Sequence, residues 1–249
     1  MRTTIKAQLL LLPLILATNA AIAENEDLSA LRSSGPVHEW QPAKDDKAHN
    51  IKAWQKREEN KAIRSFKLDY VVDVDLETIG LAYMDLENWS RWWWKVKDIR
   101  MLKMNSPHDF IFYLAHHAPV ANPDRDVIIS VHVEPYSKRK GYATMSMKAI
   151  PEYLPKSPGM IRMEAEDMVA KFTPLDNSRT RIELEGYIDP SGGMPGWSIN
   201  FIQRQAPYYT ALGFQRWVEQ SQDYYRGSYK EKKASGSYPT LMSLNNKQG

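Results

Sequence analysis

One stretch near the C-terminus constrains the fold more than any other part of this sequence: Gly186-Tyr-Ile-Asp-Pro-Ser-Gly-Gly-Met-Pro-Gly-Trp-Ser-Ile-Asn200. It follows an alternating apolar segment that is typical of a β-strand, and it leads into a long, aromatic-rich segment with helical periodicity. An apolar helix that follows a sheet must bury its stripe against the apolar face of that sheet. The junction therefore predicts a lid helix across a curved sheet, with an apolar cavity between them.

Alternation of apolar and polar residues predicts the strands of that sheet. It is strongest over 66–74, 127–133 and 182–188, where one face is apolar and the other faces solvent. Short polar or Pro-containing turns favour antiparallel pairing. Weaker strands are predicted at 37–43, 51–57, 97–104, 109–115, 141–149 and 160–171.

Two segments break this alternation and predict helices. Leu76, Ile79 and Leu86 recur at helical spacing, and Asp75 is placed to cap the N-terminus of a helix over 75–86. The terminal helix is expected to begin near Met194. Pro207 lies well inside it and is expected to kink or split it, because proline removes a backbone donor.

The N-terminus has the pattern of a secretory signal peptide. Arg2 and Lys6 precede an apolar run, and small residues end at Ala23, where cleavage is expected. A retained signal anchor is the alternative. The expected layout is a signal peptide at 1–23, a flexible segment at 24–36, one domain at 37–227 and a flexible tail at 228–249. We expect an exported protein in the periplasm.

Composition excludes several classes of function. The 33 basic and 30 acidic residues nearly balance, and two of the basic residues belong to the leader, so nothing favours a nucleic-acid partner. The chain has no cysteine, which excludes disulfides, thiolate metal sites and cysteine nucleophiles. Adjacent His116 and His117 point to opposite faces of a strand and make a poor metal site. No catalytic motif or cofactor fingerprint is present.

Four segments in order resemble the START (steroidogenic acute regulatory protein-related lipid-transfer) domain family, from about Val37 to Arg226. They are Glu39-Trp40 with Ile51–Arg57, Asp85–Trp92, Ala118–Asp126, and Asp189–Trp197, in which Ser191 stands where the family often has glycine. The resemblance implies an α+β helix-grip fold, a curved antiparallel sheet wrapped around a long C-terminal helix. It also implies one lipid held in a tunnel, with no chemistry.

Charged and aromatic residues in these segments are the site candidates. Arg125 beside Asp126 is interpreted first as a salt bridge that joins loop to strand, and second as a ligand contact; the same alternatives apply to Arg162 and Glu164. Of the clustered tryptophans at 89 and 92–94, at least two are expected in the core. A place in a pocket wall and contact with a membrane interface are the alternatives for the others.

The leading hypothesis is a monomeric, non-enzymatic protein that binds a single sterol, phospholipid or fatty-acyl lipid, with transient membrane contact. Binding alone and binding with transfer are both open alternatives. The candidate cavity residues are Trp92, Phe112, Leu114, His117, Arg125, Arg162, Glu164, Phe201, Tyr208, Tyr209 and Leu212. A second hypothesis is a helix-grip cyclase or hydrolase that acts on aromatic or polyketide-like substrates through Arg125, His117 and Glu164. A third, the filled-core hypothesis, is a non-transferring envelope protein whose filled core leaves no chamber for a lipid.

Overall fold

The structure of this chain, a computed structural model, describes residues 39–59, 63–118 and 122–229. The expected signal peptide, the expected segment at 24–36 and residues 230–249 of the expected tail lie outside the described residues. Tyr229, which the sequence assigns to that tail, is 3% exposed and packs against Tyr224 and Tyr225 at ring-centroid distances of 5.4 and 5.3 Å. The packed part of the chain therefore extends to Tyr229.

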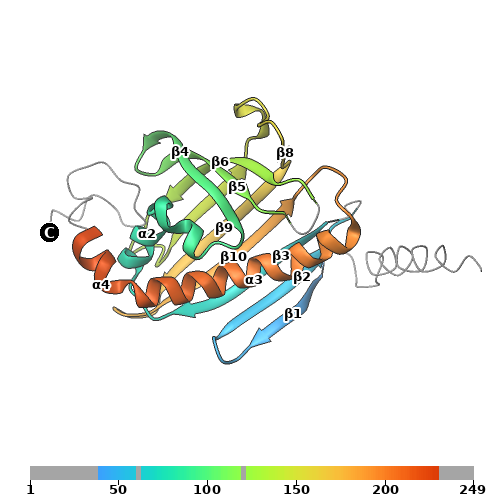
Figure 1. Cartoon of the computed structure of the whole chain (residues 1–249). Coiled ribbons are helices and arrows are strands. Elements are labelled where there is room, and N and C mark those ends of the chain that lie inside the picture. Colours follow the sequence, from blue (N-terminus) through green and yellow to red (C-terminus); the bar gives the residue numbers. More distant parts are fainter. Residues whose placement is uncertain (1–38, 60–62, 119–121, 230–249) are drawn as a thin grey trace, which may run out of the picture. The chain divides into compact units, whose positions relative to one another are not determined.

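The described residues form ten strands and one long helix with several short helical elements (Figure 1). The strands are β1 (Trp40–Asp46), β2 (Ile51–Arg57), β3 (Arg64–Val72), β4 (Val96–Ser106), β5 (Asp109–His116), β6 (Arg125–Glu134), β7 (Ala143–Ala149), β8 (Ile161–Arg162), β9 (Ala165–Pro174) and β10 (Thr180–Asp189). The helical elements are α2 (Leu76–Met84), η1 (Leu86–Arg91), η2 (Pro151–Tyr153), α3 (Gly196–Gln220), α4 (Gln222–Tyr224) and η3 (Tyr225–Tyr229).

All the strands belong to one sheet, in the order β1-β2-β3-β10-β9-β7-β6-β5-β4, with β8 paired to β6. Neighbours in this order are antiparallel, whereas β8 pairs in parallel. Helix α3 lies across one face of the curved sheet (Figure 1). The predicted α+β helix-grip fold is therefore confirmed.

The face of the sheet toward α3 carries the main core. Phe66, Leu68, Tyr70 and Val72 on β3 are all buried there, as their alternation predicts. The opposite face differs from the prediction. A second cluster (Ile111, Tyr113, Ala115 and Ile128) is buried on it, beneath partly buried Leu102, Ile150, Leu154 and Met160. The outer face over β5 and the start of β6 is thus covered by the chain and does not face solvent.

The single strand predicted at 160–171 is two strands. β8 pairs with the start of β6, where Met163 N–H donates to the Asp126 carbonyl at 2.8 Å, and β9 begins only at Ala165. Arg162 fixes this arrangement because its Nε and Nη2 donate to the two carboxylate oxygens of Asp126 at 2.9 and 3.0 Å. It also donates to the carbonyls of Pro151, Leu154 and Pro155.

Helix α2 begins as the sequence predicts, since Asp75 Oδ1 accepts the N–H of Thr78 at 2.8 Å. It ends at Met84, two residues before the predicted end, because the chain then coils into η1. Trp89 of η1 is buried and donates its Nε1–H to the Tyr83 carbonyl at 3.1 Å. This bond fixes the first of the clustered tryptophans in the core.

Helix α3 runs through Pro207 as one element, so the split expected there is not present. Proline has no N–H to donate to the carbonyl of Gln203, one turn earlier. The side-chain amide of Gln55 on β2 donates to that carbonyl at 3.1 Å instead. The sheet thus supplies the hydrogen bond that proline removes. None of the helices in the described residues is long and apolar enough to cross a membrane.

The C-terminal half of α3 approaches the backbone before β4 very closely. A Cβ added at Gly213 would lie 2.4 Å from the carbonyl oxygen of Trp92, a contact that neither backbone segment can relieve by rotating a side chain. Glycine at this position therefore lets the helix seat against the tryptophan segment.

We predict that Gly213→Ala destabilises the protein. In an ordinary helix interior this change stabilises by about 1 kcal/mol. Here the clash with Trp92 should reverse the sign and cost about 1–3 kcal/mol, as overpacking does. Urea unfolding followed by circular dichroism measures the difference. A variant as stable as the wild type would show that the close approach is absent.

Candidate functional site

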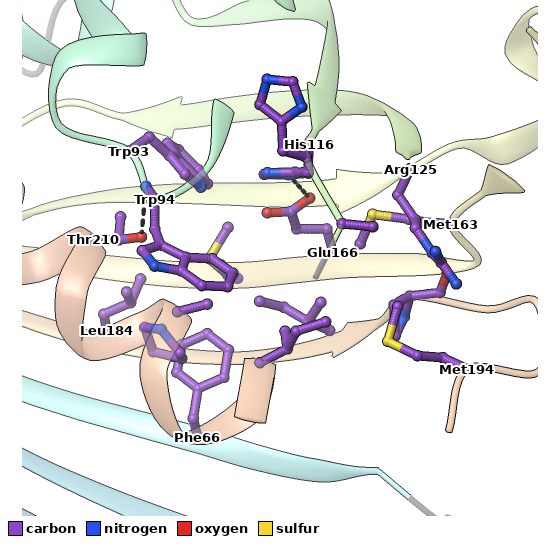
Figure 2. A pocket seen from close by; sticks show the side chains of 18 residues that line it. Phe66, Trp93, Trp94, His116, Arg125, Met163, Glu166, Leu184, Met194 and Thr210 are labelled. Carbon is purple, nitrogen blue, oxygen red and sulfur yellow. Dashed lines mark hydrogen bonds and ion pairs between the residues drawn. The ribbon is translucent and has the colours of Figure 1, made fainter. Parts of the chain in front are cut away.

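A cavity lies between the N-terminal half of α3 and the concave face of the sheet (Figure 2). Its walls come from β3, β5, β6, β9 and β10, from the loop at Trp93 and Trp94, from the junction before α3, and from α3 itself. Most of the lining side chains are apolar. The titratable or hydroxyl side chains that line it are His116, His117, Arg125, Glu166 and Thr210.

The cavity is small, with a volume of about 60 Å³. Pockets that hold drug-sized ligands have ~300–1,000 Å³. An aromatic cluster fills the rest of the concavity: Trp89 stacks on Trp93 at 4.7 Å between ring centroids, and Tyr83 contacts Phe214 at 4.5 Å. The sheet is therefore filled beneath the C-terminal half of α3 and hollow beneath its N-terminal half.

Helix α3 presents one face to this cavity. Ile202, Ala206, Pro207 and Thr210 line it. Ile202, Ala206 and Thr210 recur every four residues, and Pro207 lies three residues before Thr210, so all four share one side of the helix. Thr210 Oγ1 accepts the backbone N–H of Trp94 at 3.3 Å, which ties the helix to the tryptophan loop (Figure 2). Helix α3 is thus hydrogen-bonded to the cavity wall at Thr210.

The junction before α3 turns through a left-handed backbone. Ser191, Gly192 and Gly193 have φ values of 56°, 71° and 62°. Glycine adopts this conformation without strain, and a Cβ at Gly192 would also lie 2.6 Å from a side-chain carbon of Ile161. Ser191 occupies the first of these positions, where its Oγ accepts the backbone N–H of Glu164 at 3.0 Å. The junction is thereby held against the segment between β8 and β9.

His116 and Glu166 form a buried pair in the cavity wall. His116 Nε2 and Glu166 Oε2 are 3.0 Å apart, and Glu166, from β9, is 2% exposed (Figure 2). Burial acts to lower the pKa of His116. The charge of Glu166 and hydrogen bonds to Glu166 and the Trp94 carbonyl outweigh burial, so the pKa is raised above its ordinary value of 6.5. The pair therefore favours a protonated imidazole beside a carboxylate.

Arg125 lies directly across from His116 in the register of β5 and β6. It is 3% exposed, and its guanidinium donates to three backbone carbonyls, those of Pro123, Pro190 (3.3 Å) and Ser191 (3.4 Å). None of the ion pairs between described residues involves it. The expected salt bridge at this place exists, but it joins Asp126 to Arg162.

The side chain of His117 lies on the opposite face of the strand end from that of His116. Its side chain is mostly exposed at the cavity margin, with Nδ1 at 3.7 Å from Asp124 Oδ2, and its backbone N–H donates to the Lys95 carbonyl at 2.8 Å. Adjacent histidines thus diverge, as expected for strand geometry. Among the described residues no group of three or more His, Asp or Glu side chains is placed to hold a metal ion.

Of the residues predicted to form the cavity, the structure brings only His117 and Arg125 to its lining. Trp92, Phe112, Leu114 and Leu212 pack into the core beneath the C-terminal half of α3. Tyr208 is buried on another face of α3, with its hydroxyl bonded to Asp46. Arg162 is sealed in its pair with Asp126, and Glu164, Phe201 and Tyr209 are exposed.

Sequence reasoning missed the polar residues that do face the cavity, His116 and Glu166. Both follow from period two, since His116 continues the inward series of Phe112 and Leu114, and Glu166 shares a face with Met168. The predicted strand ended at 115, one residue too early. The acid–base hypothesis therefore moves from His117 and Glu164 to His116 and Glu166.

The lining combines a few polar side chains with a mainly apolar surface. A carboxylate and an imidazole can exchange a proton. The one hydroxyl side chain among the lining residues, Thr210, already accepts a hydrogen bond from the Trp94 amide. The other walls are apolar and offer a ligand burial from water.

We predict that Glu166→Gln lowers the pKa of His116, because it removes the charge that opposes burial. In the wild type, the stability that the raised pKa contributes is complete below pH 6.5 and is lost as the pH rises through the folded-state pKa. NMR titration of the histidine ring protons and urea unfolding across this range measure both effects. Asp109→Asn, which removes the partner of exposed His132 (2.6 Å), is the matched control and should leave His116 unchanged. An unchanged His116 titration in Glu166→Gln would refute the pairing.

The sequence comparisons give a distant relative and no family assignment. No family model matches the chain. An uncharacterized protein of Pseudomonas aeruginosa is 24% identical over 183 residues, which cover 74% of this chain and 88% of that protein. This relative carries no functional description, so solved structures are the more informative comparison.

Two solved structures share the arrangement of sheet and helix. A fragment of the STAR-related lipid transfer protein of Xanthomonas axonopodis superposes with a TM-score of 0.65 and 22% identity, covering 73% of this chain and 99% of that one. Human StAR-related lipid transfer protein 5 gives a TM-score of 0.64 and 14% identity, covering 83% and 98%. This chain therefore has the helix-grip fold of the START domains.

Proposed function

We propose that this protein binds a single lipid between α3 and the concave face of the sheet, and that it does no chemistry on it. The observation that carries the proposal is an apolar cavity beneath the N-terminal half of α3, in a fold that proteins named for lipid transfer share. Burial of an acyl chain or a sterol would supply the affinity, at about 0.8 kcal/mol for each methylene removed from water.

A lipid needs more room than the cavity of about 60 Å³ provides, so the N-terminal half of α3 must move outward to admit it. That half is loosely held: Trp197 and Phe201 are 50% and 46% exposed, and no side chain caps the helix start. The C-terminal half is firmly held, since the Gln215 amide donates to the carbonyls of His49 and Val71 at 3.0 and 2.8 Å. This contrast supports movement of one half against the other.

Pro207 marks the boundary between the two halves. The helix there lacks a backbone hydrogen bond, and Gln55 closes the gap from the sheet. On the mobile side, opening would break that side-chain bond and the weak Asn122–Ser198 contact at 3.5 Å. A proline at this position is a common cause of bending in a long helix.

The remaining parts of the proposal concern where the protein works. A cleaved leader ending at Ala23 would export a monomer to the periplasm. Exposed Trp197 and Phe201, next to the cavity, are suited to brief contact with a membrane interface during loading and release. Exchange of a fluorescent lipid with acceptor vesicles distinguishes transfer between membranes from simple retention of the lipid.

We predict that Ala206→Phe weakens lipid binding. Ala206 lines the cavity, and a phenyl ring there would occupy the space of the ligand. Excluding two methylenes should weaken binding about tenfold. Gln220→Phe adds the same ring at an exposed position of α3 and is the matched control. Solvent extraction with mass spectrometry, and titration with fluorescent lipids, give the readout. If wild-type protein neither carries nor takes up lipid, the filled-core hypothesis replaces this one.

We predict that Pro207→Ala slows lipid exchange and raises the free energy of unfolding by up to about 3 kcal/mol, since it restores the backbone donor for the Gln203 carbonyl. Stopped-flow transfer of a fluorescent lipid to acceptor vesicles measures the rate. Gln55→Ala should act in the opposite direction, and its effect should shrink when Pro207→Ala is also present. An exchange rate that is the same in all these variants would show that the helix does not hinge at Pro207.

A further inference from the structure

Three charged side chains line the wall of the cavity, and their charges do not cancel. Glu166 and His116 face each other at 3.0 Å, and Arg125 stands across from His116 on the adjacent strand. Figure 2 shows Arg125 on the side of Met163 and Met194, away from Phe66 and Trp94. With His116 protonated, the pair with Glu166 is neutral, and the guanidinium remains as a net positive charge.

Neither of the two neighbouring carboxylates in the described part of the chain is free to neutralise that charge. Asp126 has both oxygens bound to Arg162. Asp124 is bound to Lys97 at 2.6 Å and to the Ala118 amide at 3.1 Å. Burial lowers the pKa of Arg125, and the charge of Asp124 opposes this effect without overcoming it. Within the described ranges the guanidinium therefore has no ion-pair partner, and the wall around it is largely apolar.

A buried cation without a counter-charge is costly, so proteins rarely keep one unless it meets a ligand. Two of the carbonyl contacts of Arg125 are long, at 3.3 and 3.4 Å, and carbonyl dipoles do not cancel a full charge. The planar guanidinium suits the paired oxygens of a carboxylate or phosphate better than any neutral head.

We propose that the lipid of this cavity has an anionic head, a carboxylate or a phosphate monoester, that binds Arg125. This inference rests on the proposed lipid binding and adds the class of ligand to it. The head lies between Arg125 and the junction, and the chain runs along Met168 and Leu184 toward Phe66. A neutral sterol or alcohol leaves the positive charge unmatched and binds more weakly.

The test compares amphiphiles that share one saturated chain and differ only in the head: palmitate, hexadecyl phosphate, hexadecanol and hexadecyltrimethylammonium. Each displaces a fluorescent fatty acid from the wild-type protein, below its micelle concentration. At least one anion should bind about tenfold or more tighter than hexadecanol, and the cation should bind least. Whichever anion binds tighter identifies the head as carboxylate or phosphate.

Arg125→Gln should lose this preference for anions while it keeps its affinity for hexadecanol. Arg181→Gln removes an exposed arginine paired with Asp69, outside the cavity, and controls for general charge effects. Arg125→Lys keeps the positive charge but lacks the planar, bidentate donor geometry of the guanidinium. It should retain part of the preference for anions that Arg125→Gln loses. If Arg125→Gln does not fold, the wild-type series alone decides.

The outcomes separate the two proposals. Hexadecanol that binds wild-type protein as tightly as both anions overturns the anionic head and leaves lipid binding intact. Anion preference that survives in folded Arg125→Gln also overturns it. Failure of every amphiphile to bind overturns lipid binding and the anionic head together.

Discussion

The buried ion pair between Asp126 and Arg162 determines how one end of this molecule is arranged. Because Arg162 also binds the carbonyls of Pro151, Leu154 and Pro155, the pair holds the segment after β7 over the outer core cluster and holds β8 beside β6. Removing one partner of such a pair typically costs about 3–5 kcal/mol. The pair also occupies the carboxylate of Asp126, next to Arg125. That carboxylate is therefore not free to pair with the Arg125 guanidinium in the cavity wall.

A second constraint is how the concavity of the sheet is divided. Large rings from α2, η1 and the C-terminal half of α3 interlock there, and edge and stacked contacts of this kind pack to high density. The N-terminal half of α3 offers Ile202, Ala206 and Pro207 to the cavity, and these side chains are smaller than the rings of the aromatic cluster. The cavity is therefore a consequence of residue size along one helix, and the looser half of the helix is the half that covers it.

Much of the fold was predictable from the sequence, because apolar alternation and helical spacing directly indicate which residues are buried. The inward faces of β3 and β6, the Asp75 cap and the terminal helix all followed from local pattern. The candidate site was not predictable in this way, because it depends on the residues at which strands end and on which charged side chains form ion pairs. His116 was missed by ending a strand one residue early, and Glu166 by treating 160–171 as one strand. The choice of Arg162 by Asp126 is a long-range pairing that no local pattern encodes.

Arg125 links the polar end of the cavity to the lid. Its guanidinium holds the carbonyls of Pro190 and Ser191, and these residues lead directly into α3 through a left-handed turn. In the proposed complex an anionic head competes for those same donors, so binding of the head weakens the hold on the junction that positions the helix. Entry of an anionic ligand would thus weaken the hydrogen bonds from Arg125 that hold the junction before α3. A neutral ligand does not compete for these donors. The hydrogen bonds from Arg125 to the junction would then stay in place and hold α3 closed.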